Sequence, residues 1–63
     1  MNERDLDDLR GAVEHCRAGL KALEAAESTM VRTGSVYPTH IHLATAELAH
    51  AIEVATKVAL RSQ

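Results

Sequence analysis

The chain is poor in the residues that usually stabilise a small domain. It has one cysteine, Cys16, and one aromatic residue, Tyr37, among 63 residues. A single cysteine excludes a disulfide within the chain, no close-set group of cysteines and histidines suggests structural zinc, and one ring cannot form an aromatic cluster. A domain of this size buries only about 60% of its unfolded surface, so its core is marginal. We therefore expect association with another chain to supply the missing stability.

The sequence also lacks a long apolar run and a catalytic motif. A membrane span needs roughly 20 apolar residues, whereas Glu47, His50 and Glu53 interrupt the best candidate. Residues 2–10 are charged and mostly acidic, unlike a signal peptide. We find no glycine-rich phosphate loop, no nucleophile elbow and no acid/base pair, so we expect no enzymatic activity, no cofactor and no membrane partner. With Cys16 as a free thiol on an apolar stripe, these features predict a soluble cytoplasmic protein.

A heptad pattern predicts a first helix over residues 3–32. Its apolar residues follow one another at alternating steps of three and four: Leu6, Leu9, Val13, Cys16, Leu20 and Leu23. This rhythm is typical of a helix that packs against another helix. Asn2 can cap its start, and we expect fraying after Ala26, because Glu27 breaks the apolar pattern and Ser28 and Thr29 are weak helix formers.

The glycine and the proline that follow predict a turn at about residues 33–38. Gly34 can adopt the left-handed conformation that ends many helices, and Pro38 cannot continue a helix from inside. A second, alanine-rich helix is expected over residues 39–61, with Thr39 as its cap or Pro38 in its first turn. The fold class is therefore all-α: a single domain, residues 1–63, forming a two-helix antiparallel hairpin.

The apolar surface of this hairpin exceeds what one neighbouring helix can cover. The second helix carries an apolar arc too broad for a single partner, and on the first helix Ala12, Gly19 and Ala26 form a strip beside the leucines that permits a close helix contact. At about 1.5 Å per residue the first helix is roughly 10 Å longer, which predicts an overhang at Leu6 and Leu9. A second copy would cover it and complete a four-helix bundle. The predicted dimer and core seam consists of Val13, Cys16, Leu20, Leu23, Ile41, Leu48, Ile52 and Val58.

Glu47 and His50 form an E-x-x-H pattern, as in the bundles that hold two metal ions between carboxylates. Such a site needs a facing carboxylate, for which Glu24 is the candidate. A half-exposed polar edge is the simpler interpretation, so no metal site is assigned. His15 is expected to be a solvated helix residue. On a helix the histidines at 40 and 42 point in nearly opposite directions and cannot share an ion, whereas on an extended segment they could.

Two charged features remain open. Glu27 occupies an apolar heptad position, where it either reaches solvent near the turn or fixes register with a partner. Arg10, Arg17 and Lys21 lie along one side of the first helix and suggest RNA binding as an alternative function, although acidic residues intermingle with them and the net charge is −2.

The sequence favours a small non-enzymatic protein–protein interaction module: a regulator, inhibitor, adaptor or chaperone that acts as a homodimeric helical bundle. Its partners are a second copy and another protein, while nucleic acid is not favoured. RNA binding is the first alternative, and a metal-binding bundle using Glu47 and His50 is the second. The residues predicted to contact a protein partner are Leu6, Leu9, Met30, Val36, Tyr37, Leu43, Glu47, His50 and Val54.

Overall fold

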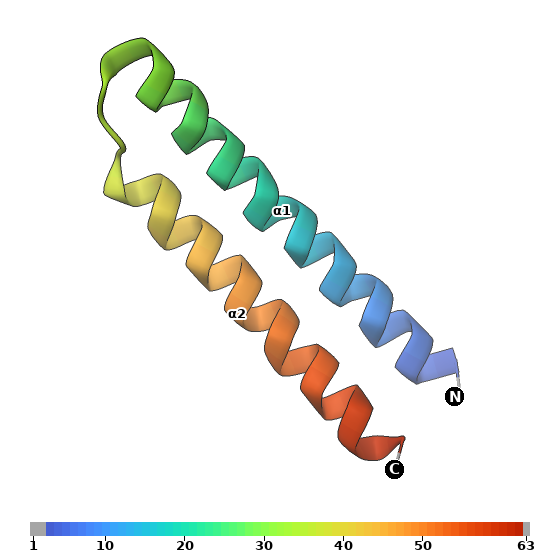
Figure 1. The fold of residues 1–63 in the computed structure, drawn as a ribbon. Helices are drawn as coiled ribbons and strands as arrows, with labels where there is room; N and C mark the ends of the chain where they lie inside the picture. The colour runs from blue at the N-terminus through green and yellow to red at the C-terminus, as the bar shows by residue number, and fades with distance from the viewer. Residues whose placement is uncertain (1–2, 63) are drawn as a thin grey trace.

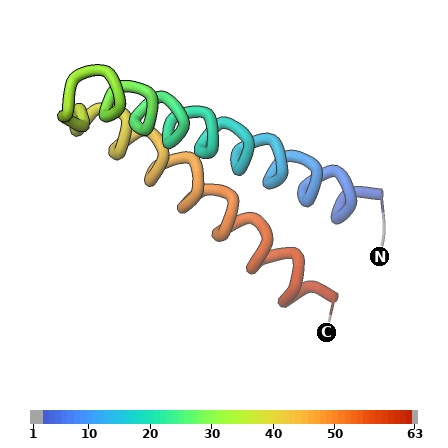
Figure 2. The backbone as a smooth tube through the Cα atoms, turned by 45° about the horizontal axis from the view of Figure 1, so that its top comes forward, coloured from blue at the N-terminus to red at the C-terminus, as the bar shows by residue number. Residues whose placement is uncertain are grey.

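A computed structural model describes residues 3–62 and shows an all-helical hairpin. Helix α1 spans Glu3–Thr33, helix α2 spans Pro38–Arg61, and the described part of the chain contains no strand. The two helices run side by side in opposite directions, and both ends of the chain lie at the end opposite the turn (Figures 1 and 2). The molecule is a thin rod of 47 × 14 × 13 Å. The predicted hairpin is confirmed, whereas the proposed cap Asn2 lies outside the described residues.

Helix α1 continues past Ala26 to Thr33, so the expected fraying is wrong. Thr29 is buried at 3% exposure, and its carbonyl accepts a hydrogen bond of 2.8 Å from the Thr33 hydroxyl. Gly34 then ends the helix with φ 77°, and its N–H donates to the Met30 carbonyl at 2.8 Å. Tertiary burial and this left-handed glycine outweigh the weak helix propensity of the last turns.

Helix α2 begins with Pro38 in its first turn, one residue before the predicted start. Pro38 fits there because the first N–H groups of a helix have no partner inside the helix. Tyr37 is the N-cap residue in an extended conformation, and its side chain makes no capping hydrogen bond. No acidic residue lies in the first turn of α2, whereas Glu3 and Asp5 lie in the first turn of α1.

Small side chains form the contact between the two helices. A line of small residues, every seventh on each helix, is buried: Ala12, Gly19 and Ala26 on α1, and Ala44 and Ala51 on α2. We call it the small-residue line. A Cβ added to Gly19 would lie 2.9 Å from Leu48 Cγ and 3.4 Å from the Ala44 carbonyl oxygen. The close helix approach indicated by this spacing is therefore observed.

The overhang of α1 lies at the turn, not at Leu6 and Leu9 as the sequence suggested. Gly19 is level with Ala44 and Leu48, and the Arg61 side chain reaches Asp5, so the two helices end together at the open end. With this register Pro38 is level with about residue 27, and α1 continues for roughly 9 Å beyond the start of α2. Figure 1 shows the connection running back along this extra length. An extended four-residue link, rather than a tight turn, causes the difference.

Candidate protein-binding face

One side of the hairpin exposes nearly the whole predicted seam. Val13 is 47% exposed, Leu20 56% and Ile52 67%, although all three are large apolar residues. We define the leucine face as Leu6, Leu9, Val13, Cys16, Leu20 and Leu23 on α1 with Ile41, Leu48 and Ile52 on α2. Leu9 and Leu48 are half-buried, and the other members are exposed. The small-residue line joins the helices within the chain, and most of the leucine face stays exposed.

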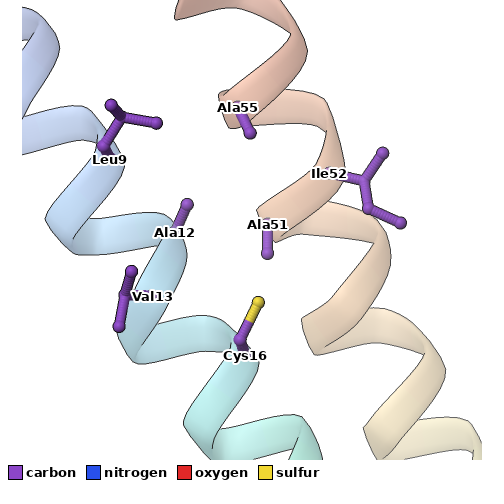
Figure 3. Close-up of a pocket in the computed structure, with 7 residues that line it drawn as sticks. All are labelled: Leu9, Ala12, Val13, Cys16, Ala51, Ile52 and Ala55. Carbon is purple, nitrogen blue, oxygen red and sulfur yellow. The ribbon is translucent and has the colours of Figure 1, made fainter.

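A groove runs along the leucine face between the two helices (Figure 3). Its volume is about 410 Å³, and its lining is entirely apolar: Leu9, Ala12, Val13, Cys16, Ala51, Ile52 and Ala55. Alanines lie between the helices, while Leu9, Val13 and Ile52 are the larger lining residues. Cys16 is a free, exposed thiol in this lining. A concave apolar strip of this kind suits the side chains of another helix.

Val58 differs from the other predicted seam residues because it is buried inside the hairpin at 3% exposure. It lies seven residues after Ala51 and therefore on the small-residue line of α2 rather than on the leucine face. Only this member of the predicted seam is fully enclosed by the chain's own helices.

A second group of exposed apolar residues lies at the turn. Met30 is 50% exposed, Val31 81%, Val36 43% and Tyr37 54%. The ring of Tyr37 lies 5.9 Å from that of His40, centroid to centroid, and so covers part of the start of α2. These residues belong to the α1 overhang and the connection, which α2 does not cover. We call them the turn cluster.

The polar side of the hairpin contains a contact that the sequence did not reveal. The Nδ1 of His15 lies 2.6 Å from Oε2 of Glu47, and the His15 ring meets that of His50 edge-on at 4.3 Å. His15 is thus a half-buried partner of Glu47 and His50 and not the solvated residue that the sequence had suggested. Glu24, the candidate carboxylate facing the E-x-x-H pattern, is exposed. Nevertheless, within residues 3–62 no group of three or more His, Cys, Asp or Glu could hold a metal ion.

The remaining residues of the predicted partner-binding edge lie beside this contact. Leu43 and His50 are exposed, and Glu47 and Val54 are half-buried. Glu47 is occupied by its hydrogen bond to His15, which the periodicity of α2 alone could not predict. The polar edge expected from the sequence is therefore partly paired within the chain, through His15.

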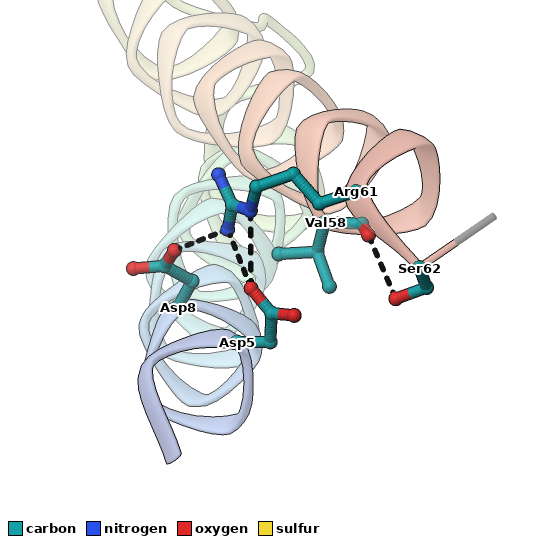
Figure 4. Close-up of polar contacts among 5 residues, drawn as sticks. All are labelled: Asp5, Asp8, Val58, Arg61 and Ser62. Atoms are coloured by element: carbon teal, nitrogen blue, oxygen red, sulfur yellow. Dashed lines mark hydrogen bonds and ion pairs between the residues drawn. The ribbon is translucent and has the colours of Figure 1, made fainter. Parts of the chain in front are cut away.

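Arg61 closes the open end of the hairpin (Figure 4). Its Nε donates to Asp5 Oδ1 at 3.0 Å, and one terminal nitrogen donates to Asp8 Oδ2 at 2.7 Å. The hydrogen bond to Asp5, followed by that to Asp8, raises the pKa of Arg61 above its ordinary value. The side chain of Asp5 is only 8% exposed. Its position seven residues before Ala12, on the small-residue line, is the sequence signal that could have revealed a buried ion pair.

The basic residues considered for RNA binding are engaged locally or exposed. Arg10 lies 3.8 Å from Asp7, and Arg17 lies 3.0 Å from Glu14, each pair one helical turn apart on the solvent side of α1. Lys21 is exposed on the same helix. Pairs of this kind are common on solvated helix surfaces.

Comparison with known proteins found no matching family model, no matching curated protein and no matching solved structure. Neither helix of the described chain is both long enough and apolar enough to cross a membrane. The functional interpretation therefore depends on the surface of the hairpin itself.

Proposed function

We propose that this chain is a small non-enzymatic protein–protein interaction module that acts as a homodimeric four-helix bundle. The observation that supports the proposal is the exposed leucine face, which runs along both helices and includes an apolar groove. Contiguous apolar surface of this extent typically marks an interface in a soluble protein. A second copy buries this face and leaves the turn cluster free for another protein, in a regulator, inhibitor, adaptor or chaperone.

The total surface area supports a dimer of ordinary size. The chain exposes 4727 Å² for a mass of 6.8 kDa. A compact folded monomer of that mass exposes about 3,950 Å², so the excess is roughly 800 Å². This excess is about the area that each partner loses in a standard protein–protein interface. One copy on the leucine face would therefore bring the exposed area per chain to an ordinary value.

The proposal is tested by sedimentation equilibrium with a matched pair of substitutions. Leu20 and Leu60 are similarly exposed, at 56% and 63%, but Leu60 points away from the leucine face. Burial of a leucine contributes roughly 1.5–3 kcal/mol, and the dimer contains two copies, so Leu20→Glu is expected to weaken it by at least about 100-fold. Leu60→Glu should leave the dissociation constant within a few-fold of the wild-type value.

The wild-type chain should sediment as a dimer at micromolar concentration. A stable monomer at all concentrations, or a Leu20→Glu variant that dimerises as well as Leu60→Glu, would refute the proposed function. Circular dichroism of each variant shows whether the loss of association is accompanied by loss of helix.

A further inference from the structure

We infer that the two copies pack with their two-fold axis parallel to the helices, so that α1 of each copy lies on α2 of the other and both turns lie at the same end. This inference rests on the proposed homodimer and concerns how the leucine face is covered. The alternative is an axis perpendicular to the helices, which places α1 on α1, α2 on α2 and the turns at opposite ends.

Side-chain size along the leucine face favours the parallel axis. The register set by Gly19 and Arg61 puts Leu6 and Leu9 level with Ala59 and Ala55. When α1 lies on the partner's α2, these two leucines therefore meet alanines. At the next level along the helices, Val13 and Cys16 of α1 lie opposite Ile52 and Leu48 of α2. Here the smaller side chains are on α1 and the larger ones on α2, the reverse of the level before. Large side chains then meet small ones at these two levels, and at the third level Leu20 meets Thr45 while Leu23 lies beside Ile41. Most contacts therefore pair a large side chain with a smaller one, which is how helix layers interdigitate.

The perpendicular axis gives a poorer match. With the axis at the centre of the leucine face, near Cys16, the leucines at 6 and 9 would meet those at 23 and 20 of the other copy. Val13 would meet Cys16 of the other copy. The spacing between the two α1 helices would then have to be wide at the ends and narrow in the middle, whereas packed helices keep a nearly constant distance of about 8–10 Å.

Charge complementarity supports the same arrangement through Glu27. This residue breaks the apolar pattern of α1 and is level with about Pro38, the first residue of α2. With the parallel axis, Glu27 faces the N-terminal end of the partner's α2, which has no acidic residue in its first turn and no side-chain cap. A carboxylate is stabilised there by the helix dipole. With the perpendicular axis, Glu27 would instead approach the start of the partner's α1, where Glu3 and Asp5 already lie.

Disulfide trapping with single-cysteine variants distinguishes the two axes. Each variant carries Cys16→Ser and one new cysteine, so a disulfide can form only between two chains. An equimolar mixture of Leu20→Cys and Thr45→Cys, equilibrated with oxidised and reduced glutathione, should give a heterodimeric disulfide, because these positions are level on α1 and the partner's α2. The matched mixture of Leu20→Cys and Leu9→Cys, which face each other only across the perpendicular axis, should give little.

A second measurement uses Glu27→Gln with Glu24→Gln as its control. Both glutamates are exposed on α1, but Glu27 continues the heptad positions of the leucine face, whereas Glu24 lies at its edge and about one turn away from the start of the partner's α2. Loss of two dipole interactions per dimer should raise the dissociation constant about 3- to 30-fold for Glu27→Gln, with little change for Glu24→Gln.

The outcomes separate this inference from the proposed function. If Leu20→Cys pairs with Leu9→Cys, or if Glu27→Gln leaves the dimer unchanged or tighter, the arrangement is wrong while the homodimer stands. If the wild-type chain sediments only as a monomer, the proposed function itself is wrong.

Discussion

Two glycines of α1 give a direct test of how closely the helices approach. Gly11 and Gly19 lie in the same helix, but a Cβ on Gly11 would meet nothing within 4 Å, whereas a Cβ on Gly19 would lie 2.9 Å from Leu48 Cγ and 3.2 Å from its Cδ2. The substitutions Gly11→Ala and Gly19→Ala therefore make the same chemical change in open space and in the helix contact.

The expected free energies follow from two opposing effects. Replacing a helical glycine by alanine stabilises the helix by about 1 kcal/mol, partly because the unfolded chain loses freedom, and this gain applies equally to both positions. At Gly19 the new methyl group must displace Leu48 or separate the helices, and overpacking of this kind costs about 1–3 kcal/mol. Gly11→Ala should therefore stabilise the protein by about 1 kcal/mol, and Gly19→Ala should be neutral or destabilising by up to about 2 kcal/mol.

Thermal unfolding followed by circular dichroism, at one fixed protein concentration, measures the difference. For a domain of this size 1 kcal/mol corresponds to about 4–8 °C in Tm, so the two variants should differ by at least several degrees. Equal stabilisation by both substitutions would show that the helices do not meet at Gly19. The register on which the dimer arrangement depends would then be wrong as well.

Three further predictions concern the turn, the open end and the groove. Gly34→Ala should lower the stability by about 1 kcal/mol, seen as a lower Tm, because Gly34 has φ 77° and a side chain is strained there. Arg61→Gln should lower the Tm. Because pairing with Asp5 and Asp8 raises the pKa of Arg61, the stabilisation by the ion pair is fully present below the ordinary arginine pKa and is lost only when the pH rises above the raised pKa of the folded state. The Tm difference should accordingly be the same at about pH 7 and about pH 10, and a difference that shrinks over this range would contradict the assignment. The rate at which N-ethylmaleimide alkylates Cys16 should fall as the protein concentration rises through the dimer dissociation constant, whereas a constant rate would mean that the groove stays open.

The helices and the hairpin could be predicted because their signals are local. The heptad spacing from Leu6 to Leu23, together with Gly34 and Pro38, gave the two helices to within one residue at all four of their ends, leaving aside the unconfirmed cap. The end of α1 was expected to fray because Thr29 is a poor helix former, but Thr29 is buried, and burial depends on contacts that helix propensity does not include.

The sequence could not decide which apolar line faces the neighbouring helix. Leucines and small residues lie side by side on α1, and either could form the contact. The structure places Ala12 and Gly19 in it, since backbones that approach closely gain many contacts, and it leaves Leu20 exposed. Whether a partner covers Leu20 stays a prediction.

Contacts between the helices depended on a register that no local pattern contains. The pairing of His15 with Glu47, and of Arg61 with Asp5, requires α1 to extend past the start of α2 at the turn. The predicted overhang at Leu6 and Leu9 takes the two helices to be level at the turn, which would place different residues opposite one another. The extended four-residue link therefore sets the register of the two helices, and without that register the pairing of the polar groups could not be predicted.

Alanines form the contact inside the hairpin and leucines form its exposed face, and this separation has an evolutionary consequence. Substitution of an exposed leucine changes which partner binds and leaves the fold of the single chain intact. Enlargement of a buried alanine disrupts the contact between the two helices, so folding fails before any partner can bind. A hairpin of this kind can acquire new binding partners through substitutions at a few exposed positions. A set of related hairpins would then differ mostly along one side and stay nearly invariant along the other.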